Sequence, residues 1–288
     1  MKLNFCILKQ VLVIAVMITA AASSLAWSIN SSAAKLKPTR TVVYKTAGDR
    51  ELHLYIFDPA GFKKSDRRSC FLSIHGGGWT GLSPLRQYPF AEYFTKLGMV
   101  SVCVEYRLVK KGSKSTVYDC VRDARSAVRY VRKHAAELGI DPNRIVVNGG
   151  SAGGHLAAST ALFDGVNETG DDTGVSCKPD ALVLYSPVID TSKEGYGNKK
   201  CGKGWRTISP LHQVKPGMPP TIIFHGTKDP TCPYKGAKAF NEAMQKAGNK
   251  CELVSEQNAG HSYMYGKKSY FDKVLEKTKE FLVANKLL

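Results

Sequence analysis

One short stretch restricts the fold of this chain more than any other feature of the sequence. An apolar segment at residues 145–148 runs directly into Gly149-Gly150-Ser151-Ala152-Gly153, and an alanine-rich segment with helical character continues to residue 163. A sharp turn from a strand into a helix needs small residues, because its backbone is strained and neighbouring chains pass close to it. We therefore expect a strand–turn–helix unit that lifts the Ser151 side chain above a sheet.

Strands and helices are expected to alternate along the rest of the chain. Residues 51–57 alternate between apolar and polar side chains, which indicates a half-buried strand. In residues 116–138 apolar side chains recur at intervals of three and four, which indicates an amphipathic helix that ends at Gly139. The other expected strands are residues 70–74, 100–104, 181–185, 221–224 and 251–255, and the other expected helices are residues 235–247 and 270–282. This alternation predicts an α/β fold, a mostly parallel central sheet with helices on both faces, and a site beyond the carboxyl ends of its strands.

Ser151 is the candidate nucleophile. The pattern G-x-S-x-G is weak evidence by itself in a chain with 26 glycines. Its position between a strand and a helix is stronger evidence, because the first amides of the helix then point at the group that Ser151 attacks. The alternative is a glycine-rich helix N-terminus that binds nothing.

A second glycine-rich segment, His75-Gly76-Gly77-Gly78-Trp79, follows the expected strand at residues 70–74. Glycines let backbone N–H groups approach a substrate oxygen closely. Acyl transfer needs such donors, because its tetrahedral intermediate concentrates negative charge on one oxygen. We expect the amides of Gly77, Gly78 and Ala152 to form an oxyanion hole, and His75 to brace the loop. A plain flexible loop is the alternative.

With these two motifs the chain resembles α/β-hydrolases of the hormone-sensitive-lipase group and of the feruloyl- and acetyl-xylan-esterase-like (BD-FAE-like) carboxylesterases. Tyr106-Arg107-Leu108 and residues 139–144 add to the likeness, which extends over residues 40–285. The resemblance implies the α/β-hydrolase fold and a serine hydrolase that cleaves carboxylic esters of short acyl chains through an acyl-enzyme on Ser151. Acetyl or feruloyl groups on polysaccharide are the expected substrates. The alternatives are a serine peptidase of the prolyl-oligopeptidase type and a catalytically inactive hydrolase fold used for binding.

A serine nucleophile needs a histidine base, and the histidine needs an acid that fixes its tautomer. His261 lies after the last expected strand and before the last helix, where the resemblance places the base. Asp229 follows the strand at residues 221–224 and is the expected acid. The chain order Ser151, Asp229, His261 is the one that this fold uses. Asp190 is the rival acid, and a surface aspartate in a turn is the other interpretation of Asp229.

The substrate is less well defined by the sequence. Residues 187–216 form the longest irregular connection and are expected to border the pocket, and no long lid is evident, which disfavours a lipase for long-chain fats. Aromatic side chains suit an acyl chain or a sugar face, although each is also compatible with ordinary packing. The candidate substrate-binding residues are Trp79, Tyr106, Trp205 and Tyr263. We expect a small-molecule or polysaccharide ester as the substrate.

Basic residues outnumber acidic ones 41 to 24, a net charge of +17. Because they are scattered and no recognition motif accompanies them, we expect no nucleic-acid partner and no stable membrane partner. A basic rim on the irregular connection could attract an acidic polysaccharide; it consists of Lys193, Lys199, Lys200, Lys203 and Arg206. No cofactor and no metal are expected, since no spacing of Cys and His is typical of a metal site. The oligomeric state is left open.

The first 26 residues have the features of a signal peptide. Lys2 and Lys9 flank an apolar start, residues 11–22 are apolar apart from Thr19, and Ser24-Leu25-Ala26 offers small residues for cleavage. We therefore expect a signal peptide at 1–26, a flexible lead-in at 27–40, a catalytic domain at 41–288, and a secreted or periplasmic protein. An uncleaved anchor is the alternative. Export permits disulfides, and Cys177 with Cys201 is the expected pair.

Overall fold

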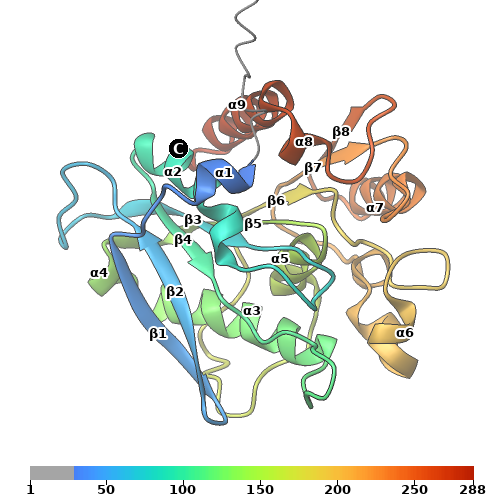
Figure 1. The fold of residues 1–288 in the computed structure, drawn as a ribbon, viewed down its shortest axis with the longest axis horizontal. Helices are drawn as coiled ribbons and strands as arrows, with labels where there is room; N and C mark the ends of the chain where they lie inside the picture. The colour runs from blue at the N-terminus through green and yellow to red at the C-terminus, as the bar shows by residue number, and fades with distance from the viewer. Residues whose placement is uncertain (1–28) are drawn as a thin grey trace, which may run out of the picture.

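The computed structural model describes residues 29–288, and these form one eight-stranded sheet (Figure 1). The strands, in chain order, are β1 (Arg40–Ala47), β2 (Arg50–Phe57), β3 (Arg68–Ile74), β4 (Val100–Val104), β5 (Ile140–Gly150), β6 (Ala181–Tyr185), β7 (Thr221–Gly226) and β8 (Cys251–Glu256). Their spatial order is β1-β2-β4-β3-β5-β6-β7-β8. The β1–β2 and β2–β4 pairs are antiparallel, and all later pairs are parallel.

Helices cover both faces of this sheet (Figure 1). Apolar side chains of α3 (Val117–Lys133), α5 (Ala152–Leu162) and α7 (Tyr234–Lys246) belong to the core on one face. Those of α1 (Ile29–Ala33), α2 (Tyr88–Lys96) and α9 (Lys268–Ala284) belong to the core on the other face. Short helices occupy the connections: η1 (Pro84–Gln87), α4 (Ala135–Leu138), α6 (Asn198–Cys201), η2 (Gly202–Ile208), η3 (Pro210–Gln213) and α8 (Tyr263–Gly266). The predicted fold class, a mostly parallel sheet with helices on both faces, is confirmed.

The register of the central strands brings the two glycine-rich segments together. Ile74 at the end of β3 lies opposite Gly149 in β5 and opposite Val104 in β4. The chain therefore leaves these parallel strands at the same edge of the sheet. The loop that begins at His75 and the turn that contains Ser151 emerge there as neighbours.

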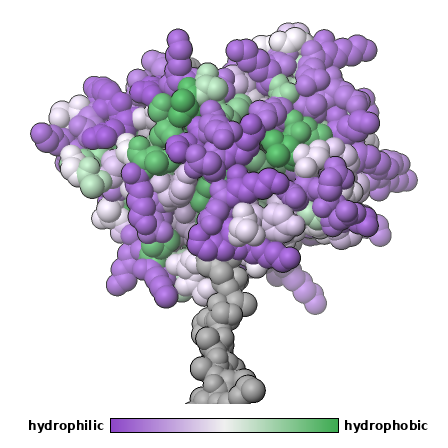
Figure 2. All heavy atoms as spheres, turned by 90° about the horizontal axis from the view of Figure 1, so that it is seen from above, coloured by the Kyte–Doolittle hydropathy of each residue, from purple (hydrophilic) through white to green (hydrophobic). Residues whose placement is uncertain are grey.

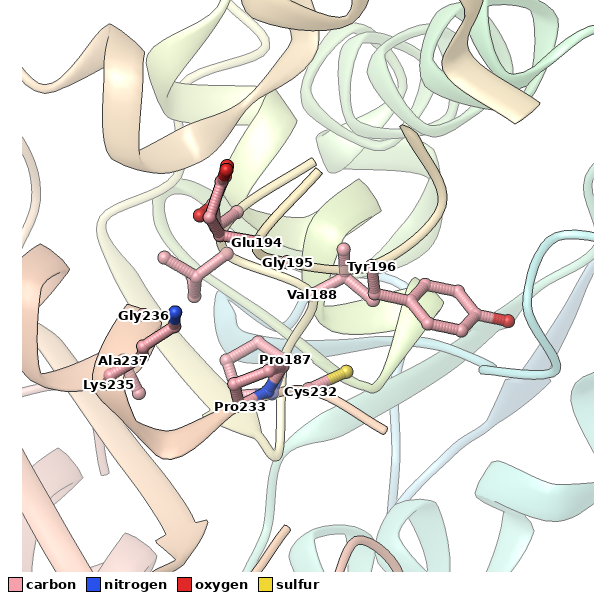
Figure 3. Close-up of a pocket in the computed structure, with 12 residues that line it drawn as sticks. Pro187, Val188, Glu194, Gly195, Tyr196, Cys232, Pro233, Lys235, Gly236 and Ala237 are labelled. Carbon is pink, nitrogen blue, oxygen red and sulfur yellow. The ribbon is translucent and has the colours of Figure 1, made fainter. Parts of the chain in front are cut away.

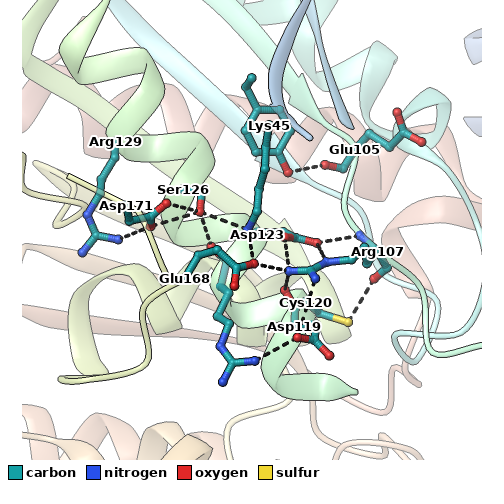
Figure 4. Close-up of polar contacts among 12 residues, drawn as sticks. Lys45, Glu105, Arg107, Asp119, Cys120, Asp123, Ser126, Arg129, Glu168 and Asp171 are labelled. Atoms are coloured by element: carbon teal, nitrogen blue, oxygen red, sulfur yellow. Dashed lines mark hydrogen bonds and ion pairs between the residues drawn. The ribbon is translucent and has the colours of Figure 1, made fainter. Parts of the chain in front are cut away.

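A buried ionic cluster, drawn in Figure 4, anchors the segment that follows β4. The carboxylate of Asp123 on α3 is fully buried and accepts hydrogen bonds from the Lys45 ammonium at 2.7 Å and from the Arg107 guanidinium at 2.7 and 2.8 Å. Glu168 binds the same two cations. A buried carboxylate needs such partners, because an unpaired charge in the interior is costly. The cluster thereby fixes residue 107, next to Tyr106.

The segment before β1 differs from the expected flexible lead-in. Residues 29–33 form the short helix α1, and its Ile29 side chain is 1% exposed in the core that contains Phe90 and Phe94. The expectation of a segment with little to bury is therefore wrong for α1, because two apolar residues one turn apart, Ile29 and Ala33, are buried in contact with η1 and α2. The predicted signal peptide at 1–26 lies outside the described residues.

The expected disulfide between Cys177 and Cys201 is not formed. All seven cysteines in the described part of the chain are free. The Cys177 thiol donates to the Thr160 carbonyl at 3.4 Å, and the Cys201 thiol is held next to Thr191, so each is enclosed separately in the core. Both behave as small buried hydrophobic residues, a role that the spacing in the sequence does not reveal.

The surface in Figure 2 is mainly hydrophilic, with separate small hydrophobic groups between the charged side chains. Between residues 29 and 288, no helix combines the length and the apolar character needed to cross a bilayer. Single exposed apolar side chains, among them Leu82 and Val283, are normal on a protein surface.

Candidate active site

The turn between β5 and α5 holds Ser151 in an unusual conformation. Its φ of 55° and ψ of −122° are strained values for a residue with a side chain, and its backbone N–H donates to the Tyr185 carbonyl at 2.9 Å. The positions of the glycines around Ser151 leave no room for a side chain, so glycine is required there. A Cβ added to Gly153 would lie 2.1 Å from the Ile74 carbonyl oxygen, and one added to Gly149 would lie 2.3 Å from the Gly153 carbonyl oxygen. The turn predicted from the sequence is present, and its small residues are explained by the close approach of neighbouring backbone.

Two hydrogen bonds join the candidate nucleophile, base and acid. Nε2 of His261 lies 2.9 Å from the Ser151 Oγ, and Nδ1 of His261 lies 2.7 Å from an Asp229 carboxylate oxygen. Asp229 comes from the connection after β7, and His261 from the connection between β8 and α8. The structure therefore brings together three residues that are far apart in the sequence.

Asp229 is held as an anion. One of its carboxylate oxygens accepts the backbone N–H groups of Thr231 and Cys232, each at 2.8 Å, and the other faces His261 and His225. Burial by itself would raise the pKa of Asp229, but hydrogen bonds from His225, from His261 and from the backbone hold it well below its usual value. An ionised Asp229 keeps the proton of His261 on Nδ1, so that Nε2 is free to accept the proton of Ser151.

The rival acid is engaged elsewhere. The Asp190 carboxylate accepts hydrogen bonds from the backbone N–H of Ser192 at 2.8 Å and from its hydroxyl at 2.9 Å. These bonds tie Asp190 to its own turn. Among the two candidate acids, the geometry therefore favours Asp229.

Tyr106 holds the glycine loop after β3 in place through hydrogen bonds to its backbone. The Tyr106 hydroxyl, 3.0 Å from the His75 carbonyl oxygen and 3.2 Å from that of Gly76, donates to the loop, and the Tyr106 ring stacks on the His75 ring at 4.3 Å. Burial lowers the pKa of His75 to about 4, so its ring is neutral at neutral pH. His75 thus braces the loop, as expected from the sequence.

The candidate oxyanion donors lie around Ser151. Gly77 and Gly78 have positive φ angles of 102° and 60° and line the pocket together with Ser151. Ala152 is the first residue of α5, directly after the nucleophile. A Cβ on Gly77 would lie 2.2 Å from the Gly81 carbonyl oxygen, so this loop conformation requires glycine.

An open pocket of about 250 Å³ leads to Ser151 and His261. Its aromatic walls are Tyr185, Tyr196 and Tyr265. The rest of its lining is made by Gly76, Gly77, Gly78, Leu82, Arg86, Gly150, Ser186, Thr231 and Ser262. Small and aromatic side chains around one nucleophile suit a small organic substrate.

A second, smaller cavity lies beside this pocket (Figure 3). Val188, Tyr196 and Cys232 are among its lining residues, and its volume of about 10 Å³ corresponds to roughly one water molecule. Tyr196 lines both spaces. The Cys232 thiol, which lines the smaller cavity, lies close to the Ser151 hydroxyl. Burial raises the pKa of Cys232 well above its usual value, so its thiol is neutral.

The four aromatic residues that the sequence suggested for substrate binding do not line the open pocket. Trp79 is fully buried and packs against Tyr196, and Tyr106 is buried beneath the glycine loop. Trp205 lines a groove on the side of α7 and packs against His212, while Tyr263 lies in a groove beside α9 and packs against Tyr270. The structure contradicts the prediction for the buried Trp79 and Tyr106, whereas substrate binding by Trp205 and Tyr263 stays a prediction.

The sequence contains only weak signals for the tyrosines that do line the pocket. Tyr185 is the last residue of β6, and the carboxyl end of a parallel strand was the place to look. Tyr265 is two residues beyond the predicted Tyr263, and the two side chains line different spaces on either side of the short helix α8. Such a local turn of the chain is not visible in a periodicity pattern.

Comparison with known proteins identifies the family. The apo form of esterase 2 from Thermogutta terrifontis has a TM-score of 0.82 and 42% sequence identity, over 86% of this chain and 95% of that chain. The same esterase phosphoramylated by tabun gives a TM-score of 0.83 and 43% identity, over the same shares of the two chains. The chain belongs to the carboxylesterases of the α/β-hydrolase fold. Within this group it matches the BD-FAE family over residues 54–192 and the TAP-like protein family over residues 195–283.

More distant curated relatives include two esterases and a xylanase. Esterase LipQ of Mycobacterium tuberculosis is 28% identical over 75% of this chain and 55% of its own length. The probable isoprenylcysteine α-carbonyl methylesterase ICMEL1 of Arabidopsis thaliana is 26% identical over 78% of this chain and 51% of its own length. Endo-1,4-beta-xylanase B of Butyrivibrio fibrisolvens is 28% identical over 62% of this chain and 30% of its own length. The chain thus spans about half the length, or less, of these curated relatives.

Proposed function

We propose that the chain is a serine hydrolase that cleaves carboxylic esters of short acyl chains through an acyl-enzyme on Ser151. The observation that carries this proposal is the pair of hydrogen bonds, 2.9 Å and 2.7 Å long, that joins Ser151, His261 and Asp229 at the base of an open pocket. Nucleophile, base and orienting acid in this arrangement activate a serine hydroxyl.

The proposed reaction has two steps. Nε2 of His261 takes the proton of Ser151 while Oγ attacks the ester carbonyl carbon, and the amides of Gly77, Gly78 and Ala152 stabilise the resulting oxyanion. The tetrahedral intermediate collapses, His261 protonates the leaving alcohol, and the acyl group stays on Ser151. A water molecule, deprotonated by His261, then attacks the acyl-enzyme and releases the acid.

The size of the site supports short acyl chains. The open pocket of about 250 Å³ is smaller than the roughly 300–1,000 Å³ of ordinary ligand pockets. The smaller cavity at Val188 and Cys232 has a volume of only about 10 Å³. Solved structures of the Thermogutta terrifontis esterase 2 have propionate or butyrate bound, and these are short acids.

The proposed substrates are acetyl or feruloyl groups on polysaccharide. The match to the BD-FAE family and the likeness to a xylanase support this substrate class. Tyr196 and Tyr265 line the pocket, and aromatic side chains suit a sugar or a phenolic ring. We also propose export to the periplasm or the medium after cleavage near Ala26, on the strength of the N-terminal sequence alone.

The proposal is tested with a series of 4-nitrophenyl esters from acetate to palmitate. We expect turnover that falls beyond butyrate or hexanoate, and we expect Ser151→Ala to abolish it while thermal unfolding changes little. Ser269→Ala, an exposed serine on α9, is the matched control and should keep wild-type turnover. Undiminished turnover by Ser151→Ala, or the absence of both turnover and labelling of Ser151 by a fluorophosphonate, would contradict the proposal.

A further inference from the structure

We propose that the alcohol part of the substrate carries a carboxylate, as an acetylated uronic acid does, and that Arg86 binds this group. The inference rests on the proposed function and specifies its substrate. It follows from the charges around the open pocket and from the different shapes of the two spaces at Ser151.

The open pocket carries a positive charge from Arg86. Arg86 on η1 lines the open pocket, and its guanidinium carbon lies 4.6 Å from the centre of the Tyr265 ring. Arginine is charged at every accessible pH and presents a planar fork of donors that matches a carboxylate. Within residues 29–288 no aspartate or glutamate side chain lines this pocket. The Asp229 carboxylate does not line the pocket and is hydrogen-bonded to His261.

A second cation reinforces the first. The Lys200 ammonium lies 3.2 Å from the Gly78 carbonyl oxygen and 3.4 Å from the hydroxyl of Tyr196, which lines the pocket. Asp190 and Glu194 border the smaller cavity, and their carboxylates accept hydrogen bonds from the Ser192 hydroxyl. The mouth of the open pocket is therefore positively charged, in a chain whose net charge is +17.

The acyl and alcohol parts of an ester differ in size, and so do the two spaces near Ser151. The cavity beside Val188 and Cys232, drawn in Figure 3, has a volume of only about 10 Å³, so it cannot hold the larger part of a polysaccharide ester. The alcohol, which is the larger part in a polysaccharide, must extend through the open pocket toward solvent. Arg86 and Tyr265 border that path, so Arg86 meets a group on the alcohol.

The test compares two acetyl esters that differ in one charge, 4-acetoxybenzoate and its neutral amide 4-acetoxybenzamide. We expect Arg86→Gln to lower kcat/KM for the benzoate by roughly tenfold, mainly through KM, and to leave that for the benzamide nearly unchanged. Arg86→Lys should retain part of the preference, and raising the ionic strength should reduce the preference of the wild type. Arg67→Gln is the matched control, since it removes one exposed positive charge. Arg67 lies next to the start of β3, at the opposite end of this strand from the loop that lines the pocket.

The outcomes separate the inference from the function on which it rests. A benzoate-to-benzamide ratio that is equal in the wild type and Arg86→Gln would overturn the inference, while continued hydrolysis of both esters would leave the proposed function intact. A second pair, the mono-4-nitrophenyl ester of glutarate and 4-nitrophenyl valerate, places the charge on the acyl side. An Arg86-dependent preference in this pair only would overturn the assignment to the alcohol. If Arg86→Gln fails to fold, Arg86→Lys and the salt dependence of the wild type still test whether Arg86 binds the carboxylate.

Discussion

Asp229 and Tyr106 support the reacting groups in different ways, and substitutions at the two residues should therefore have different effects. Asp229 fixes the tautomer of His261 through a carboxylate oxygen at 2.7 Å. Tyr106 is buried beneath the glycine loop and holds it through two carbonyl oxygens. The first residue controls a proton, and the second controls the position of backbone donors.

Asp229→Asn should lower kcat for 4-nitrophenyl acetate by about 10²–10⁴, because an amide in place of the carboxylate favours the wrong tautomer of His261. The backbone donors of Thr231 and Cys232 can still bond to the amide oxygen, so the fold should persist. Steady-state kinetics and circular dichroism measure the two effects. Asp190→Asn discriminates between the candidate acids, and a loss of similar size there would contradict the assignment.

Tyr106→Phe should lower kcat several-fold and leave KM nearly unchanged, because the oxyanion donors are less firmly positioned. The free energy of unfolding should fall by about 1 kcal/mol for the lost hydrogen bonds. Tyr130→Phe on α3 is the matched control, and urea titrations of both variants give the comparison. An unchanged kcat would show that the loop holds its position without the Tyr106 hydroxyl.

At the scale of elements, the site depends on how closely α5 approaches the end of β3. The Gly153 backbone passes so near to Ile74 and His75 that an added Cβ would lie 2.1 Å and 2.6 Å from their carbonyl oxygens. These oxygens belong to the backbone and cannot move aside as a flexible side chain could. The position of the nucleophile relative to the oxyanion loop is therefore set by a residue without a side chain.

Gly153→Ala should destabilise the protein by about 1–3 kcal/mol through overpacking, although alanine ordinarily favours a helix by about 1 kcal/mol over glycine. It should also lower kcat, since the turn and the loop are forced apart. Gly266→Ala in α8 has open space around the added Cβ and serves as the control. Equal unfolding midpoints in urea for the two variants would show that the close approach has no energetic consequence.

The helices and strands that could be predicted from the sequence are those with a clear local pattern of residues. Buried parallel strands and the strand–turn–helix unit have local signals, and they were predicted. Strand β1 was missed because it is the sheet edge, where only Tyr44 of its eight residues is buried. Helix α2 was missed because it begins at Tyr88-Pro89 and is rich in aromatic residues, whose helical preference is weak. The expected helix 116–138 is divided at His134 into α3 and α4.

At the scale of the whole molecule, the pocket is assembled from segments that no single stretch of sequence contains. Tyr185, Tyr196 and Tyr265 come from the end of β6, from the 187–216 connection and from α8. The hydrogen-bonded group of Ser151, His261 and Asp229 could be predicted because motif and chain order point to these three residues. The walls could not, because which aromatic side chains face the pocket depends on tertiary packing.

Two buried histidines should determine how the whole molecule responds to acid. Burial lowers the pKa of both His75 and His155 to about 4, and in the unfolded chain a histidine has a pKa near 6.5. Between pH 6.5 and 4 the unfolded state therefore binds protons that the native state does not, so the free energy of unfolding falls as pH is lowered. Asp229 acts outside this window, since its depressed pKa adds stability that is lost only below the usual aspartate pKa of about 3.9.

Urea titrations at a series of pH values should show stability falling from pH 6.5 to pH 4 with an uptake of nearly two protons on unfolding. His155→Gln should reduce this uptake by about one proton, because the amide of glutamine can donate to the Ile208 carbonyl that now accepts from His155 and does not titrate. His134→Gln, at a partly exposed position on the surface, is the matched control and should keep the wild-type slope. A slope that is the same in the wild type and His155→Gln would mean that other groups take up the protons, and that neutral burial of His155 does not limit the acid stability of this fold.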